Sequence, residues 1–125
     1  IKSKYELGQV VIKEFNLKLS RKIMVIDPPG YLDFIMLESA SSLIITDSGG
    51  VQEEACILKR PCVTIRETTE RPETLNIGCN ILSGINPAKT VQCATEMLNR
   101  SISYKNPFGD GKSSVYIMKI LQKLM

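Results

Sequence analysis

The chain has 125 residues, of which 43% are hydrophobic and 23% charged, with a net charge of +3. These proportions are close to those of an average globular domain, which excludes intrinsic disorder and a fibrous protein, and the length excludes a complete two-domain enzyme. Three phenylalanines, four tyrosines and no tryptophan are too few aromatics, at this small charge, for a typical nucleic-acid surface. We expect residues 1–125 to form a single domain with a hydrophobic core.

The cysteines predict buried, reduced thiols. Cys56, Cys62, Cys79 and Cys93 lie in apolar runs without a Cys-x-x-Cys pair, and the chain has no histidine to complete a zinc site. No apolar run approaches the length of a membrane span, and the first residues lack a signal-peptide core. We therefore expect a cytoplasmic protein without a metal ion or another cofactor.

Short apolar runs alternate with segments of helical periodicity along the chain. The strands that we expect are 23–26, 43–45, 62–65 and 80–82. The helices that we expect are one through Leu7 to Phe15 and four more near 31–40, 47–58, 87–98 and 112–124. This alternation predicts an α/β fold, with a parallel sheet and helices on both of its faces.

Ligands of such sheets bind at the carboxyl ends of the strands, so the loops there are the candidate site. They are 27–34, 46–54 and 66–73. In the second loop, Ser48, Gly49 and Gly50 lie between a predicted strand and a predicted helix, where bare backbone N–H groups and the helix dipole attract a phosphate. The same stretch also fits a glycine turn in which Asp47 or Ser48 caps the helix.

Charged side chains mark the rest of this region. Glu53 and Glu54 differ by about 100° in direction on a helix, so one of them is expected to face the cleft, and periodicity does not select which. The third loop, Arg66 to Glu73, contains arginines that can hold phosphate oxygens. It also fits a solvated loop with internal ion pairs.

Gly109-Asp110-Gly111-Lys112-Ser113 is similar to part of a P-loop, a phosphate-binding motif. That motif needs a glycine five positions before its second glycine, and Asn106 stands there. The preceding stretch does not read as a strand. We therefore interpret the segment as a turn that begins the last helix.

Four segments resemble, in order and spacing, the non-hydrolysing UDP-N-acetylglucosamine 2-epimerases, relatives of the GT-B glycosyltransferases. They are Asp27 to Phe34 (DPPGYLDF), Thr46 to Ala55 (TDSGGVQEEA), Thr68 to Glu73 (TTERPE) and Asn106 to Ser113 (NPFGDGKS). The resemblance implies the carboxyl-terminal, Rossmann-like domain of a GT-B fold.

The resemblance also implies a UDP site. Ser48, Gly49 and Gly50 match the phosphate-binding turn of the family, Glu54 matches the carboxylate that holds the ribose hydroxyls, and Arg71 matches an arginine of the sugar-diphosphate site.

Two further positions match the uracil end of the family's site. Phe34 matches an aromatic at the uracil pocket. Pro29 stands where a relative has glutamine, so a uracil contact there is restricted to the proline carbonyl or ring.

The reaction implied is the interconversion of UDP-GlcNAc and UDP-ManNAc by elimination of UDP and its readdition, which serves polysaccharide biosynthesis. The family's acid–base carboxylates lie in an amino-terminal domain and a site histidine lies upstream of this segment, so the catalytic residues are unknown here and the chain alone is expected to be inactive. Its partners would be UDP, a UDP-N-acetylhexosamine, the amino-terminal domain and a second copy in a homodimer. The alternatives are a GT-B sugar transferase domain and a non-catalytic nucleotide-binding module.

Overall fold

The computed structural model describes residues 23–124, and the chain divides into two units, 1–34 and 35–125, with the boundary inside helix α2 (Tyr31–Ala40). The helix expected through Leu7 to Phe15 lies outside the described residues. The strand expected at 23–26 is wrong, because these residues are exposed and have no regular secondary structure. An apolar run becomes a strand only where a neighbouring strand completes its hydrogen bonds, and this run pairs with none of the described strands.

The second unit is built on a three-stranded parallel sheet. Its strands are β1 (Ile44–Thr46), β2 (Cys62–Thr64) and β3 (Asn80–Leu82), in the order β1-β2-β3. Ile45 pairs with Val63, and Val63 with Ile81. The parallel sheet predicted from the alternating pattern is thereby confirmed for three of its four expected strands.

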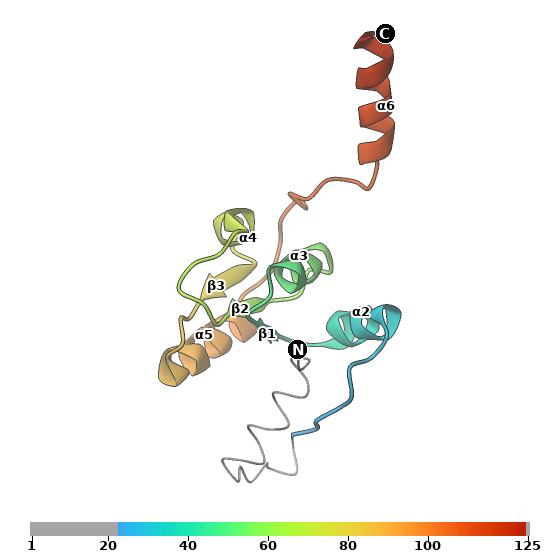
Figure 1. The fold of residues 1–125 in the computed structure, drawn as a ribbon. Coiled ribbons are helices and arrows are strands. Elements are labelled where there is room, and N and C mark those ends of the chain that lie inside the picture. Colours follow the sequence, from blue (N-terminus) through green and yellow to red (C-terminus); the bar gives the residue numbers. More distant parts are fainter. Residues whose placement is uncertain (1–22, 125) are drawn as a thin grey trace. The chain divides into compact units, whose positions relative to one another are not determined.

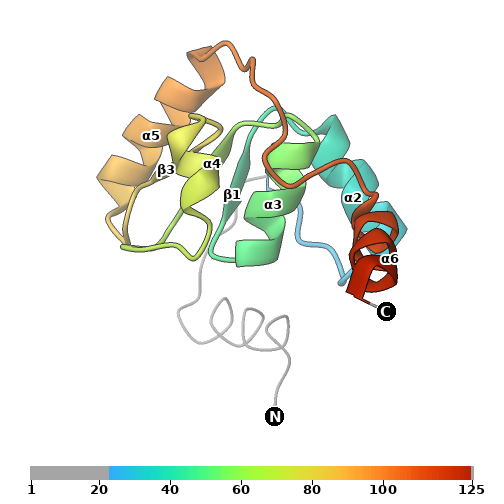
Figure 2. The same ribbon diagram turned by 90° about the horizontal axis from the view of Figure 1, so that it is seen from above.

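Helices cover both faces of this sheet, as predicted (Figures 1 and 2). They are α3 (Gly49–Ile57) and α4 (Pro72–Asn76) on one face and α5 (Pro87–Asn99) on the other. The alternation of side chains along β2 explains the two layers. Cys62 packs with Ile44 and Ala55, on the side of α3, whereas the next residue, Val63, packs with Cys93 and Met97 of α5.

The helices expected at 31–40 and near 112–124 are confirmed as α2 and α6 (Ser113–Leu124). No residue of α6 is buried, and its apolar side chains are exposed. A turn at 107–108 and a bend at Gly111 precede α6, and the Lys112 N–H donates to Asp110 Oδ1 at 3.0 Å. The interpretation as a turn that begins the last helix is therefore confirmed.

Helix α4 was not expected, because it begins at Pro72 within the polar loop 66–73. Proline suits the first turn of a helix, since the N–H that it lacks would have no helical partner there. All four cysteines are buried free thiols, as predicted. Burial raises the pKa of the Cys62 and Cys79 thiols to about 12. Within residues 23–124, no helix is long and apolar enough to cross a membrane.

Candidate functional site

The turn between β1 and α3 is the centre of the candidate site. β1 ends at Thr46 and α3 begins at Gly49, so only two residues connect them. The turn is tightened by a hydrogen bond in which the Ser48 N–H donates to Thr46 Oγ1 at 3.0 Å. Ser48 is the N-cap of α3 with an extended backbone, and its side chain makes no capping bond. The first N–H groups of α3 are therefore not capped by this hydroxyl.

Gly49 and Gly50 have no structural need to be glycine. Neither has a positive φ, and a Cβ added to either would meet no atom closer than 3.8 Å. Glycine in the first turn of a helix costs backbone entropy relative to alanine. Their small size leaves backbone N–H groups at the positive end of α3 open to a close approach by an anion.

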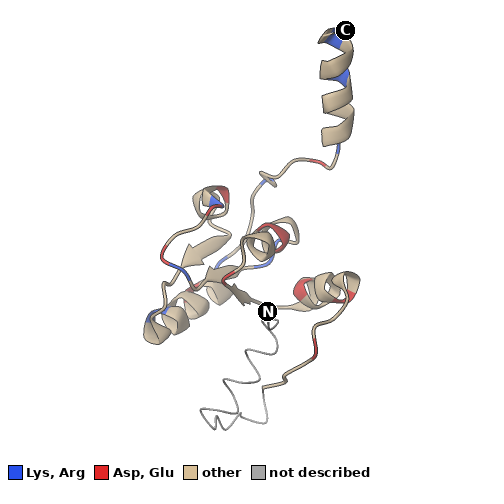
Figure 3. Cartoon of the chain, viewed as in Figure 1, with Lys and Arg blue, Asp and Glu red and all other residues tan. Residues whose placement is uncertain are grey.

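The loop after β2 lies against this turn and carries charges of both signs (Figure 3). Arg66 and Glu70 form a bidentate ion pair, in which Arg66 Nη1 donates to Glu70 Oε2 at 3.0 Å and Arg66 Nη2 donates to Oε1 at 2.8 Å. Glu70 Oε2 would be 3.8 Å from a Cβ added to Gly49. A carboxylate therefore lies beside the amino end of α3.

Arg71 is joined to α3 through Glu53, the residue that precedes Glu54. Its Nε donates to Glu53 Oε1 in an ion pair, and its Nη1 donates to the Glu70 carbonyl at 3.0 Å. The internal ion pairs that the sequence allowed in this loop are thus present. Each of the two arginines near the glycine turn is therefore paired with a carboxylate, Arg66 with Glu70 and Arg71 with Glu53.

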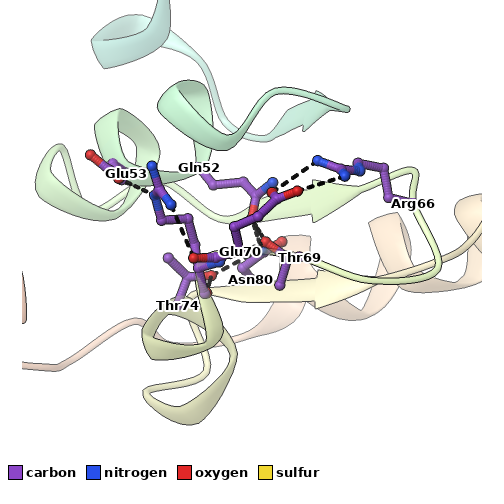
Figure 4. Close-up of polar contacts among 8 residues, drawn as sticks. Gln52, Glu53, Arg66, Thr69, Glu70, Thr74 and Asn80 are labelled. Carbon is purple, nitrogen blue, oxygen red and sulfur yellow. Dashed lines mark hydrogen bonds and ion pairs between the residues drawn. The ribbon is translucent and has the colours of Figure 1, made fainter.

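A buried polar network fixes the loop beneath these charges (Figure 4). The Asn80 side chain accepts from Thr64 Oγ1 at 2.9 Å, and its Nδ2 donates to Thr74 Oγ1 at 3.1 Å and to Gln52 Oε1 at 3.2 Å. The Thr69 hydroxyl donates to the same Gln52 oxygen at 2.5 Å. Strand β3, helix α4, helix α3 and the loop are therefore connected through two buried amides.

The network also determines the backbone before Arg71. The Thr69 oxygen accepts the Arg71 N–H at 3.0 Å, and Thr74 Oγ1 donates to the Arg71 carbonyl at 2.8 Å. Gln52 Oε1 accepts both of these bonds, whereas its buried Nε2 has no hydrogen-bond partner among the described residues. Such an unpaired donor costs about 1–3 kcal/mol.

Glu54 points in a different direction from Glu53 on α3, and it is half-buried. Its charge acts on Glu38 of α2, a buried carboxyl whose oxygens have no hydrogen-bond partner. Burial first, and then repulsion from Glu54, raise the pKa of Glu38 to about 7. The two neighbouring glutamates thus have different surroundings, since Glu53 meets Arg71 and Glu54 meets a second acid.

Phe34 and Pro29, the residues expected near uracil, belong to the first unit. Both are half-buried, and the Phe34 N–H donates to the Gly30 carbonyl at 2.9 Å in the first turn of α2. Their assignment to a uracil pocket stays a prediction. Residues 23–124 contain no cluster of acidic, histidine or cysteine side chains that could hold a metal ion.

The sequence alone did not single out Gln52, Thr69, Asn80 or the Arg66–Glu70 pair. A signal for Gln52 was present, because it lies three and four positions before Ala55 and Cys56, on the helix face that is buried. A polar side chain on that face requires partners, which indicates a buried network.

Comparison with known proteins identifies the family. The family model of UDP-N-acetylglucosamine 2-epimerase matches residues 3–122. The chain belongs to this family. Among curated relatives, the epimerase of Methanocaldococcus jannaschii is 56% identical over 114 residues, which are 88% of this chain and 31% of that protein. The Escherichia coli epimerase is 38% identical over 108 residues, 82% of this chain and 29% of that protein.

Solved epimerase structures confirm the fold class, a Rossmann-like sheet of the GT-B fold. The M. jannaschii epimerase in complex with UDP-GlcNAc and UDP matches with a TM-score of 0.81 and 54% identity, over 92% of this chain and 33% of that one. A structure of S. aureus MnaA with UDP matches with a TM-score of 0.80 and 30% identity, over 99% of this chain and 36% of that one. The chain thus spans about a third of the length of these two proteins.

Proposed function

We propose that this chain is the UDP-holding half of an enzyme that interconverts UDP-GlcNAc and UDP-ManNAc by elimination and readdition of UDP. The observation that carries the proposal is the pair Gly49 and Gly50 at the start of α3, where neither φ nor packing calls for glycine. A diphosphate supplies the reason, because it must approach the backbone N–H groups closely. The similar M. jannaschii and S. aureus structures contain UDP, which supports the same ligand here.

Each proposed contact follows from the surroundings of the residue. Ser48, Gly49 and Gly50 would bind the diphosphate through backbone N–H groups and the serine hydroxyl, with Arg71 adding a charge-assisted bond. Glu54 would accept hydrogen bonds from the ribose hydroxyls. Phe34 would contact uracil, and Pro29 would add at most its carbonyl or ring.

We propose further that residues 1–125 form one UDP-binding domain without catalytic activity of its own. General acid and base groups must be positioned against C2 of the sugar, and the chain contains no histidine and spans a third of the epimerases it matches. An amino-terminal domain would supply those groups, a second copy would form a homodimer, and the product would serve polysaccharide biosynthesis. The buried free thiols fit a reducing compartment, which supports the cytoplasm.

Calorimetry with UDP and with uridine tests the binding function on the 125-residue chain. UDP should bind at least ten-fold more tightly, because only UDP has an anion to place at α3 and Arg71. Equal affinities would contradict the proposal. NMR of the chain incubated with UDP-GlcNAc should show neither the manno epimer nor free UDP, and turnover at the rate of a two-domain epimerase would contradict the claim of inactivity.

A further inference from the structure

The Glu70 carboxylate lies next to Gly49, where the proposed diphosphate would approach α3. Its Oε2 would be 3.8 Å from a Cβ added to Gly49, which is the first residue of α3. The amino end of a helix attracts anions, and a carboxylate gains the same electrostatic stabilisation there as a phosphate oxygen. A negative charge of the chain itself is thus already present beside the candidate anion site.

Arg66 holds this carboxylate in place and keeps it ionised. The pair is bidentate, with distances of 2.8 and 3.0 Å, which is the geometry that suits arginine with carboxylate or with phosphate. The hydrogen bonds from Arg66 are the main cause that lowers the pKa of Glu70 below its ordinary value, and the charge of Arg71 adds to the effect. Glu70 is therefore an anion at neutral pH.

The residues on either side of Glu70 are tied to α3. Thr69 donates to Gln52 Oε1, and Arg71 pairs with Glu53 (Figure 4). Because both neighbours are anchored, the backbone at Glu70 has little freedom, and release of its carboxylate requires only rotation of the side chain. That side chain is about 59% exposed, so it has space to move into solvent.

We propose that the Glu70 carboxylate stands in for the ligand at the amino end of α3, and that a nucleoside diphosphate displaces it and takes over Arg66. This inference rests on the proposed function and adds to it a competitor for the anion site within the chain. Two anions cannot share the site without strong repulsion. A diphosphate must therefore displace the Glu70 carboxylate in order to bind, whereas a neutral nucleoside does not compete with it.

The chain contains a matched control for the Arg66–Glu70 pair. Arg100 and Glu96 also form an ion pair of residues four apart, with side chains about as exposed. That pair lies at the carboxyl end of α5, and Arg100 also donates to the Gly78 carbonyl. Glu96→Gln and Arg100→Gln therefore change the same charges away from the candidate site.

The test is calorimetry of UDP and uridine with the 125-residue chain and with Glu70→Gln, Arg66→Gln and the two control variants. Glu70→Gln should bind UDP more tightly, by roughly five-fold or more, because the competing charge is gone, and uridine should bind unchanged. Arg66→Gln should weaken UDP binding by a similar factor. The controls should stay within about two-fold of the original chain at the same salt concentration.

The outcomes separate this inference from the function on which it rests. If the original chain prefers UDP to uridine but Glu70→Gln brings no gain over Glu96→Gln, the inference is wrong and the function stands. An Arg66→Gln variant that binds UDP as well as the original would also overturn it. If the original chain binds UDP no better than uridine, both claims fail. Thermal midpoints of all variants show whether they are folded.

Discussion

The Arg71 guanidinium forms an ion pair with the Glu53 carboxylate, whereas Glu54, the next residue, has its charge beside Glu38. The two neighbouring glutamates on α3 therefore have different surroundings. Glu53 positions the loop that carries Arg71. Glu54 is left as the carboxylate proposed for the ribose.

This separation predicts different effects of two matched substitutions. Glu54→Gln should weaken UDP binding roughly ten- to hundred-fold, the value of a charge-assisted bond of about 1.5–3 kcal/mol. Glu53→Gln should weaken it less, because Arg71 loses its anchor but keeps its charge. UDP calorimetry on both variants checks this. An equal loss of affinity, or a larger loss in Glu53→Gln, would show that Glu54 is not the glutamate that binds the ribose.

The raised pKa of Glu38 predicts that the protein becomes less stable as the pH rises. Its carboxyl is buried and its pKa is raised from 4.5 to about 7, so the unfolded chain ionises first. The contribution of Glu38 to the free energy of unfolding is fully present below pH 4.5. It is lost as the pH rises through 7, and the loss is about 3 kcal/mol at most. Glu38→Gln should remove this part of the pH dependence. Urea unfolding at pH 5 and pH 8 measures it, and an unchanged difference between the two would refute the assignment.

The carboxyl ends of α3 and α4 each place a residue at a positive φ, where glycine is favoured. Both end in the same motif, with Lys59 (φ 55°) after α3 and Gly78 (φ 76°) after α4. The Arg60 N–H donates to the Ala55 carbonyl and the Cys79 N–H to the Thr74 carbonyl. A positive φ is strained for lysine, so Lys59→Gly should stabilise the protein by roughly 0.5–1 kcal/mol and Gly78→Ala should destabilise it by about 1 kcal/mol. Thermal unfolding decides, and a less stable Lys59→Gly would contradict the argument.

The patterns of the sequence predicted most of the second unit, because buried strands and amphipathic helices each have their own periodicity. The strand at 23–26 failed for the reason that its apolar run does not reveal whether a partner strand is available. Helix α4 was missed, since its five residues are too few to show a period. The Arg66–Glu70 and Arg71–Glu53 pairs depend on how a loop folds back on α3, which spacing along the chain does not encode.

The most direct test of the account is the preference for UDP over uridine in Gly49→Val and Arg71→Ala. A valine Cβ at Gly49 would meet only Glu70, at 3.8 Å, so this variant should fold while its branched side chain blocks the approach of a phosphate. Gly49→Val should lose most of the preference. Arg71→Ala should reduce it and leave uridine binding unchanged. If both variants are folded, by their thermal midpoints, and keep the full preference, the diphosphate does not bind at the amino end of α3 and the central claim is wrong.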